Sequence, residues 1–216
     1  MESIFEFIDA TESATKHLFE GMEYYQTLLN KIDTPMFVVD RTESSFPMEE
    51  YNKWYDDNKI DIERAEKATS LYIAEVFAQQ TLAGSILQIA DKAIEVFSKN
   101  NIIPIKAATL VKATQLKAIR FCIGPEIRGV PKGLIINAGR NQHTHFNEPK
   151  PHPLSQKVFE KLAINNPVLP PGITDSCFDL KNSDYESKAA NILHILNWND
   201  YESYKVDMIS LLQDHC

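Results

Sequence analysis

Residues 60–99, IDIERAEKATSLYIAEVFAQQTLAGSILQIADKAIEVFSK, decide the fold of this chain. The stretch is rich in Ala, Glu, Lys, Leu and Ile and contains no proline, a composition that favours the α-helix. The apolar residues that recur at helical spacing are Ile62, Ala65, Leu71, Ala74, Phe77, Leu82, Ile86, Ile89, Ile94 and Phe97. The stretch therefore predicts a long amphipathic helix, in which Gly84 allows a bend or a close helix contact.

Helical patterns flank this stretch on both sides. Before it, we expect a helix over residues 3–31 that ends at Asp33-Thr34-Pro35, a loop or short extended piece over 36–46, and a short helix from Pro47 through Tyr55. After it, helices are predicted over residues 105–122, about 131–147, 154–164, 185–198 and 199–213, with Asp200 as an N-cap and a loop over 165–183.

No segment alternates apolar and polar residues as a half-buried strand does, and the chain has only seven glycines. The prediction is an all-α helical bundle of about six to eight helices. We expect one all-helical domain over residues 1–216, with an N-terminal helical extension over about residues 1–58.

The composition is that of a globular protein: 216 residues, 44% hydrophobic and 24% charged. The three cysteines, at 122, 177 and 216, are far apart and form no CxxC pair, which argues against a disulfide scaffold or a zinc knuckle. The N-terminus has no signal-peptide pattern, and no stretch approaches the roughly 20 apolar residues of a membrane span. These features predict a cytoplasmic protein without membrane contact.

Charge is unevenly distributed along the chain. The formal net charge is −8, yet residues 99–140 contain eight basic side chains and one acidic side chain, Glu126. This segment is therefore +7 and the remainder is −15. A local basic surface suits phosphate contacts even in an acidic protein. The alternative interpretation is an ordinary solvated helical face.

The basic segment leads into Arg140-Asn141-Gln142-His143-Thr144-His145. On a helix, Asn141 and His145 lie four residues apart on one ridge, and Arg140 lies one step round. Arginine offers a rigid fork of donors that fits phosphate oxygens, and histidine exchanges protons near neutral pH. These residues suit phosphodiester chemistry. The alternative is that Arg140 and His145 are surface residues or members of a salt-bridge network.

The string GLIINAGRNQHTHFNE at residues 133–148 resembles the motif helix of HEPN domains, in which Arg and a polar residue precede His by this spacing. HEPN proteins are helical bundles that usually form homodimers with the motif helices facing one cleft. Many are ribonucleases of toxin, antiviral or RNA-processing systems, and others are non-catalytic binding modules. The resemblance therefore implies an RNA substrate, a homodimer and, for a toxin, an antitoxin partner.

The resemblance implies a role for each motif residue. His145 is expected as the general acid or base, Arg140 as the group that stabilises phosphate charge, and Asn141 as the residue that orients the imidazole or the phosphate. The expected reaction is attack by the RNA 2′-hydroxyl, giving a 2′,3′-cyclic phosphate without a metal or other cofactor. Substrate contacts are expected from Lys132, Arg128 and His143, although exposed side chains without a role are the alternative at each position.

Two other functions remain open at this stage. His143, His145, Glu148 and His152 are residue types that bind zinc or iron, but residues i and i+2 of a helix point about 200° apart, which disfavours a shared ion. A non-catalytic module that binds nucleotide, RNA or protein is the other alternative. The chain lacks the GxxxxGK[ST], GxGxxG, GxSxG and HExxH motifs, so their enzyme classes lose support.

Overall fold

The computed structural model describes residues 2–29, 48–148, 150–181 and 186–213. The chain divides into two compact units. The larger unit comprises Met1–Met22 and Gln79–Cys216, and the smaller unit comprises Glu23–Ala78. The predicted extension over about residues 1–58 thus includes parts of both units.

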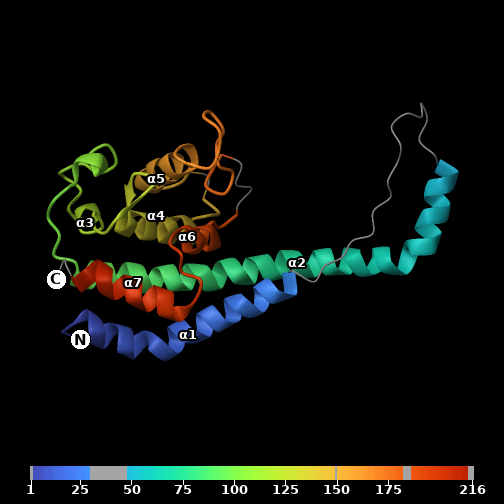
Figure 1. The fold of residues 1–216 in the computed structure, drawn as a ribbon, viewed down its shortest axis with the longest axis horizontal. Helices are drawn as coiled ribbons and strands as arrows, with labels where there is room; N and C mark the ends of the chain where they lie inside the picture. The colour runs from blue at the N-terminus through green and yellow to red at the C-terminus, as the bar shows by residue number, and fades with distance from the viewer. Residues whose placement is uncertain (1, 30–47, 149, 182–185, 214–216) are drawn as a thin grey trace. The chain divides into compact units, whose positions relative to one another are not determined.

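Within the described ranges the structure has seven α-helices, one 3₁₀ helix and one two-stranded sheet (Figure 1). The elements are α1 (Ile4–Leu29), α2 (Met48–Phe97), η1 (Ile105–Ala107), α3 (Leu116–Ile119), β1 (Glu126–Ile127), β2 (Val130–Pro131), α4 (Lys132–Thr144), α5 (Pro153–Ile164), α6 (Ala189–Ile195) and α7 (Tyr201–Gln213). The prediction of an all-α helical bundle is confirmed.

Helix α2 is longer than expected, because residues 48–97 form one continuous helix of 50 residues. The prediction of two helices separated near residues 56–59 is wrong. The connecting residues Asp56, Asp57, Asn58 and Lys59 include neither glycine nor proline, so nothing in the backbone chemistry forces a break. Asn58 instead donates from its side chain to the carbonyl of Trp54, one turn earlier in the same helix.

The prediction of a helix over residues 105–122 is also wrong. Only η1 and the four-residue α3 form there. Side chains that follow α2 bind the backbone of this segment: Ser98 Oγ donates to the carbonyl of Arg120 at 2.8 Å, and Asn100 Nδ2 donates to that of Ile119 at 2.7 Å. These backbone carbonyls therefore accept hydrogen bonds from side chains and not from the amides of a regular helix. Tertiary contacts thus override the Ala-, Lys- and Leu-rich composition, which favours a helix.

A two-residue turn joins β1 and β2, which pair in antiparallel register. The turn residues Arg128 and Gly129 have φ angles of 52° and 77°. Two consecutive positive φ angles are typical of the tight hairpin turns whose twist matches that of paired strands. Helix α4 begins directly after β2. The sequence pattern indicated only that one predicted helix ends and another begins near this point.

Helix α4 lies in the core of the larger unit and packs against α5 and α6 (Figure 1). Leu134, Ile135 and Ile136 are fully buried. A Cβ at Gly139 would lie 2.9 Å from Cγ1 of Ile192, so glycine at this position permits the close approach of α6. Helix α4 is therefore held on several sides, which fixes the polar residues near its C-terminal end.

The outer helices follow local sequence signals. Helix α5 has proline in its first turn, and Ser203 N–H donates to Oδ1 of Asp200 at 2.7 Å before α7, as expected for an N-cap. The first residues of α1 join the core, where the Phe7 and Phe97 rings meet edge to face at 5.8 Å. The predicted loop over 36–46 and the stop at Asp33-Thr34-Pro35 lie outside the described residues. None of the described helices is long and apolar enough to cross a membrane.

Candidate functional site

A cavity of about 700 Å³ opens in the larger unit beside the motif helix. Four parts of the chain line it: the C-terminal part of α2, the segment 114–121, helix α4 and the start of α5. The lining residues are Asp91, Glu95, Thr114, Gln115, Leu116, Lys117, Ala118, Arg120, Phe121, Asn137, Arg140, Asn141, His152 and Leu154. Two of the three predicted catalytic residues, Arg140 and Asn141, therefore lie in one cavity.

Four of these side chains form a closed polar ring. Asn137 Nδ2 donates to Oδ1 of Asp91 at 2.8 Å, and Asn141 Nδ2 donates to Oδ1 of Asn137 at 3.2 Å. Arg140 Nη1 donates to Oδ1 of Asn141 at 2.8 Å. The ring closes where Arg140 Nε lies 3.7 Å from Oδ2 of Asp91. The guanidinium is thus held from both sides, by an amide of α4 and a carboxylate of α2.

The ring contains an ion pair with one buried partner and one partly exposed partner. The Asp91 side chain is 8% exposed and that of Arg140 is 33% exposed. Burial raises the pKa of the Asp91 carboxyl, and the hydrogen bond from Asn137 and the charge of Arg140 act in the opposite direction. Among the described residues, the buried Arg140 Nε atom has no hydrogen-bond partner, because Asp91 lies beyond hydrogen-bonding distance. This arrangement leaves one donor of the guanidinium without a described partner.

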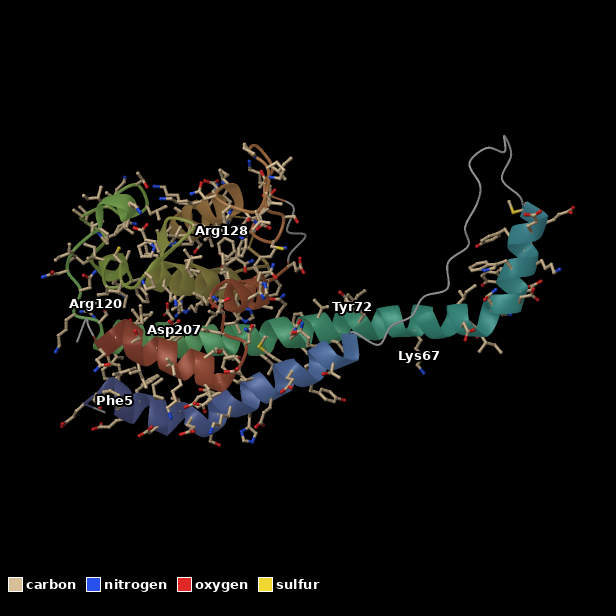
Figure 2. The ribbon with its side chains drawn as sticks, viewed as in Figure 1. Phe5, Lys67, Tyr72, Arg120, Arg128 and Asp207 are labelled. Carbon is tan, nitrogen blue, oxygen red and sulfur yellow. The ribbon has the colours of Figure 1, made fainter. Side chains whose placement is uncertain are left out.

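Further cations line the same cavity. Lys117 and Arg120 are exposed, and Arg120 Nη1 donates to the backbone carbonyl of Glu95 at 3.0 Å (Figure 2). The carboxylate of Glu95 binds Lys92 at 2.9 Å, and this hydrogen bond is the main cause of its lowered pKa. With Arg140, three basic side chains and two carboxyl groups line the cavity. The positive segment recognised in the sequence thus forms one wall of a cavity.

His145 does not line the cavity. Helix α4 ends at Thr144, earlier than predicted, and His145 caps it with φ −121° and ψ 23°. Its imidazole is half-exposed, and Nδ1 lies 2.6 Å from Oε1 of Glu148. The end of the helix coincides with a hydrogen bond from the Thr144 hydroxyl back to the carbonyl of Arg140. The expected helical ridge joining Asn141 to His145 is therefore interrupted at its last residue.

His143 points away from the cavity. Its Nδ1 lies 2.8 Å from the hydroxyl of Ser187, and its ring packs where Gly84 of α2 has no side chain. Burial lowers the pKa of this imidazole, which favours its neutral form. A role in packing α4 against its neighbours accounts for these contacts, whereas the predicted substrate contact would need the ring to lie on the cavity side.

Arg128 and Lys132 form ion pairs away from the cavity. Arg128 Nη1 donates to Oδ2 of Asp175 at 2.7 Å, and its guanidinium lies 5.0 Å from the Phe178 ring centre. Lys132 is buried, and its Nζ lies 2.6 Å from Oδ1 of Asp207 on α7. Neither residue is among those that line the cavity. These contacts tie the hairpin turn and the start of α4 to other parts of the larger unit.

Three site residues were not recognised from the sequence in the roles that the structure gives them. Asp91 interrupts the apolar face of α2, with Ala90 and Ile94 fully buried beside it, and a lone carboxylate on such a face is a signal for a polar partner. Asn137 lies one turn before Asn141 on α4. His152 was considered only as a metal ligand, yet it lines the cavity with Arg140.

The rival metal site gains no support from this geometry. Across the described residues, no group of three or more His, Cys, Asp or Glu side chains is arranged to hold a metal ion. His145 contacts Glu148, but His143 turns toward Ser187. The two imidazoles thus have separate partners.

Comparisons with known proteins add no identity to this site: no protein-family model, no curated protein and no solved structure matches the chain.

Proposed function

We propose that this protein is a metal-independent endoribonuclease that holds an RNA phosphate in the cavity beside Arg140. The observation that carries the proposal is the ring of Asp91, Asn137, Asn141 and Arg140, which fixes a guanidinium at a cavity also lined by other cations. A guanidinium held in place before substrate arrives stabilises negative charge without reorganisation, which is the main source of electrostatic catalysis. Arginine also fits two phosphate oxygens at once.

The proposed reaction uses the nucleophile that RNA itself carries. The 2′-oxygen forms a bond to phosphorus, and the bond from phosphorus to the 5′-oxygen of the next nucleotide breaks. The 2′-hydroxyl loses its proton to a base, and the leaving 5′-oxygen gains one from an acid. The products are a 2′,3′-cyclic phosphate and a 5′-hydroxyl. Arg140 would offset the charge that develops on the phosphate oxygens.

The resemblance to HEPN domains assigns proton transfer to His145, and one contact supports that role. The carboxylate of Glu148 at Nδ1 orients the ring and leaves Nε2 directed elsewhere. A carboxylate that fixes the tautomer and orientation of a histidine is a common partner of a catalytic imidazole. His145 would then act on substrate that extends beyond the cavity.

The test is a cleavage assay on structured and single-stranded RNA in EDTA, with mapping of the product ends. Wild-type protein should release 2′,3′-cyclic phosphate ends, and Arg140→Ala should lose cleavage. Lys157→Ala is the matched control, because Lys157 is an exposed cation on α5 that does not line the cavity. Equal cleavage by wild-type and Arg140→Ala would remove Arg140 from the mechanism.

A non-catalytic module that binds RNA, nucleotide or protein is the second candidate function. The observation that favours it is the position of His145 outside the cavity. This candidate predicts RNA binding that depends on Arg140 without any cleavage product. Fluorescence anisotropy with the same RNA molecules, run beside the cleavage assay, separates the two functions.

The homodimer, the antitoxin partner and a cytoplasmic location remain predictions from the sequence and from the resemblance. Light scattering across a range of concentrations tests the dimer. Co-expression with neighbouring open reading frames tests the antitoxin, since a cognate partner should relieve any growth arrest that depends on Arg140.

A further inference from the structure

His145, to which the resemblance assigns proton transfer, lies outside the cavity, and the described residues that line it include one histidine, His152. We propose that His152 is a catalytic residue that exchanges a proton with the RNA at this cavity, so that one chain supplies both the phosphate-binding Arg140 and an acid–base group. The inference rests on the proposed ribonuclease function. In this arrangement, the acid–base group comes from the same chain as Arg140 and not from a second subunit.

The backbone around His152 is well anchored. His152 precedes α5 with φ −56° and ψ 133°, and Pro153 follows in the first turn of the helix. The carbonyl of His152 accepts a hydrogen bond from Gln156 N–H at 2.9 Å, while the next residues, Leu154 and Ser155, are buried. Proline restricts the backbone at this point, and the helix that follows is packed against the core. The backbone that carries the His152 imidazole is therefore held in place.

The three histidines nearest the motif differ in what they contact. The ring of His143 is bound to Ser187, and that of His145 is bound to Glu148. The His152 side chain is exposed, and no described residue forms a hydrogen bond or an ion pair with its ring. Of these three, His152 is the one that combines a cavity-lining position with ring nitrogens available to substrate.

The charges around His152 suit a phosphodiester. The charged residues that line the same cavity are Asp91 and Glu95 from α2, Lys117 and Arg120 from the segment 114–121, and Arg140 from α4. The cations come from two separate elements and the imidazole from a third. Arg140 and His152 thus line one cavity, and the proposal requires a phosphate held by Arg140 to lie within reach of the His152 imidazole.

The proton balance of the reaction requires two transfers. One group takes the proton of the 2′-hydroxyl as the new bond to phosphorus forms, and another gives a proton to the 5′-oxygen as its bond breaks. His152 serves one of these oxygens. A positioned imidazole that loses or gains a proton in the transition state accelerates such reactions by about 10²–10⁴-fold.

The first experiment compares wild-type, His152→Ala and His152→Asn in the EDTA cleavage assay, with His194→Ala as an exposed histidine control on α6. The His152 variants should lower the turnover rate by about 10²-fold or more. Their affinity for an uncleavable RNA with 2′-O-methyl groups should match that of wild-type. The pH profile of the residual activity should lose one of its two limbs, a change that a purely structural residue would not cause.

The second experiment tests whether one chain is sufficient. Arg140→Ala and His152→Ala proteins are mixed in the unfolded state and refolded together, so that subunits of both kinds can associate. If Arg140 and His152 act within one chain, every site lacks one of the two residues and the mixture stays inactive. If they act across two subunits, a mixed dimer contains one complete site, and recovered cleavage would overturn the single-chain arrangement.

The outcomes separate this inference from the proposed function. Cleavage by wild-type together with full cleavage by His152→Ala overturns the role of His152 and leaves the ribonuclease intact. Absence of cleavage by wild-type on every RNA overturns the ribonuclease and the His152 inference with it. Loss of cleavage in His152→Ala with an equal loss of RNA affinity overturns proton transfer and assigns His152 to binding.

Discussion

Asn137 of α4 donates a hydrogen bond at 2.8 Å to the carboxylate of Asp91, which lies 46 residues earlier on α2. This contact joins two core helices through polar atoms at a site where both helices otherwise bury apolar side chains. It also orients the carboxylate toward Arg140. The cavity therefore depends on a pair that neither helix could form alone.

Replacing Asp91 by asparagine should change the pH dependence of stability. Burial raises the pKa of Asp91 above 3.8 in the folded protein, so the native state holds this proton at pH values where the unfolded chain has released it. The stability that the protonated Asp91 contributes is fully present below pH 3.8. It is lost as the pH rises through the pKa of Asp91 in the folded protein. Asp91→Asn removes this loss, so its stability relative to wild-type should increase with pH over that range.

Urea denaturation at a series of pH values measures the difference for Asp91→Asn. Glu95→Gln is the matched control. The hydrogen bond to Lys92 lowers the pKa of Glu95, so the pH dependence of stability that Glu95 contributes has the opposite sign to that of Asp91. Its effect should be small, since Glu95 is an exposed residue. Parallel curves for wild-type and Asp91→Asn from acid to neutral pH would contradict the raised pKa.

Gly84→Ala should destabilise the larger unit through His143. A Cβ at position 84 would overlap the imidazole, so the ring must move and its 2.8 Å contact with Ser187 must lengthen or break. Overpacking of this kind costs about 1–3 kcal/mol. When His143 is also replaced by alanine, Gly84→Ala should not lower the free energy of unfolding. It should raise it by about 1 kcal/mol, because alanine has the better helix propensity. A double-mutant cycle by thermal or urea unfolding measures the coupling, and additive effects would show that the ring does not fill this space.

Sequence reasoning succeeded where local chemistry decides the structure. Asp200 before α7 acts on neighbouring residues, so the start of α7 could be predicted. It failed over residues 105–122, where the side chains of Ser98 and Asn100 capture backbone carbonyls from a distant part of the chain. Periodicity within one segment contains no information about such contacts.

The candidate site follows the same division. Arg140 and Asn141 stand next to each other in a recognisable motif, and both line the cavity. Asp91 and His152 reach it from α2 and from the start of α5, so only the packing of these elements against α4 reveals them. The basic segment was visible as a run of charge, but which of its cations face the cavity depends on tertiary structure: Lys117 and Arg120 do, whereas Lys132 pairs with Asp207.

The salt dependence of the proposed RNA binding should distinguish these cations. Removing Lys117 or Arg120 should reduce the slope of log affinity against log salt by about 1 each, if each contacts one phosphate. Lys132→Met should leave the slope unchanged and lower stability instead, because it leaves the Asp207 carboxylate with its hydrogen bond from Trp198 but without its ion pair. Anisotropy titrations at several salt concentrations measure the slopes. A reduced slope for Lys132→Met would restore the RNA-guiding role expected from the sequence.

Arg140→Lys should separate charge from geometry at the centre of the ring. Lysine keeps a positive charge but lacks the planar fork, so it cannot reproduce together the bond to Asn141 and the approach to Asp91. RNA affinity at low salt should therefore persist while cleavage falls by about 10²-fold, the typical effect of removing one preorganised donor. Arg140→Ala should lose affinity as well, and it should destabilise the fold by about 1–3 kcal/mol because Asp91 loses a charged neighbour in a buried setting. Single-turnover cleavage, RNA titrations and urea unfolding of the two variants measure these three quantities. If Arg140→Lys cleaves as fast as wild-type, the ring serves the stability of the helix contact, and its geometry contributes nothing to catalysis.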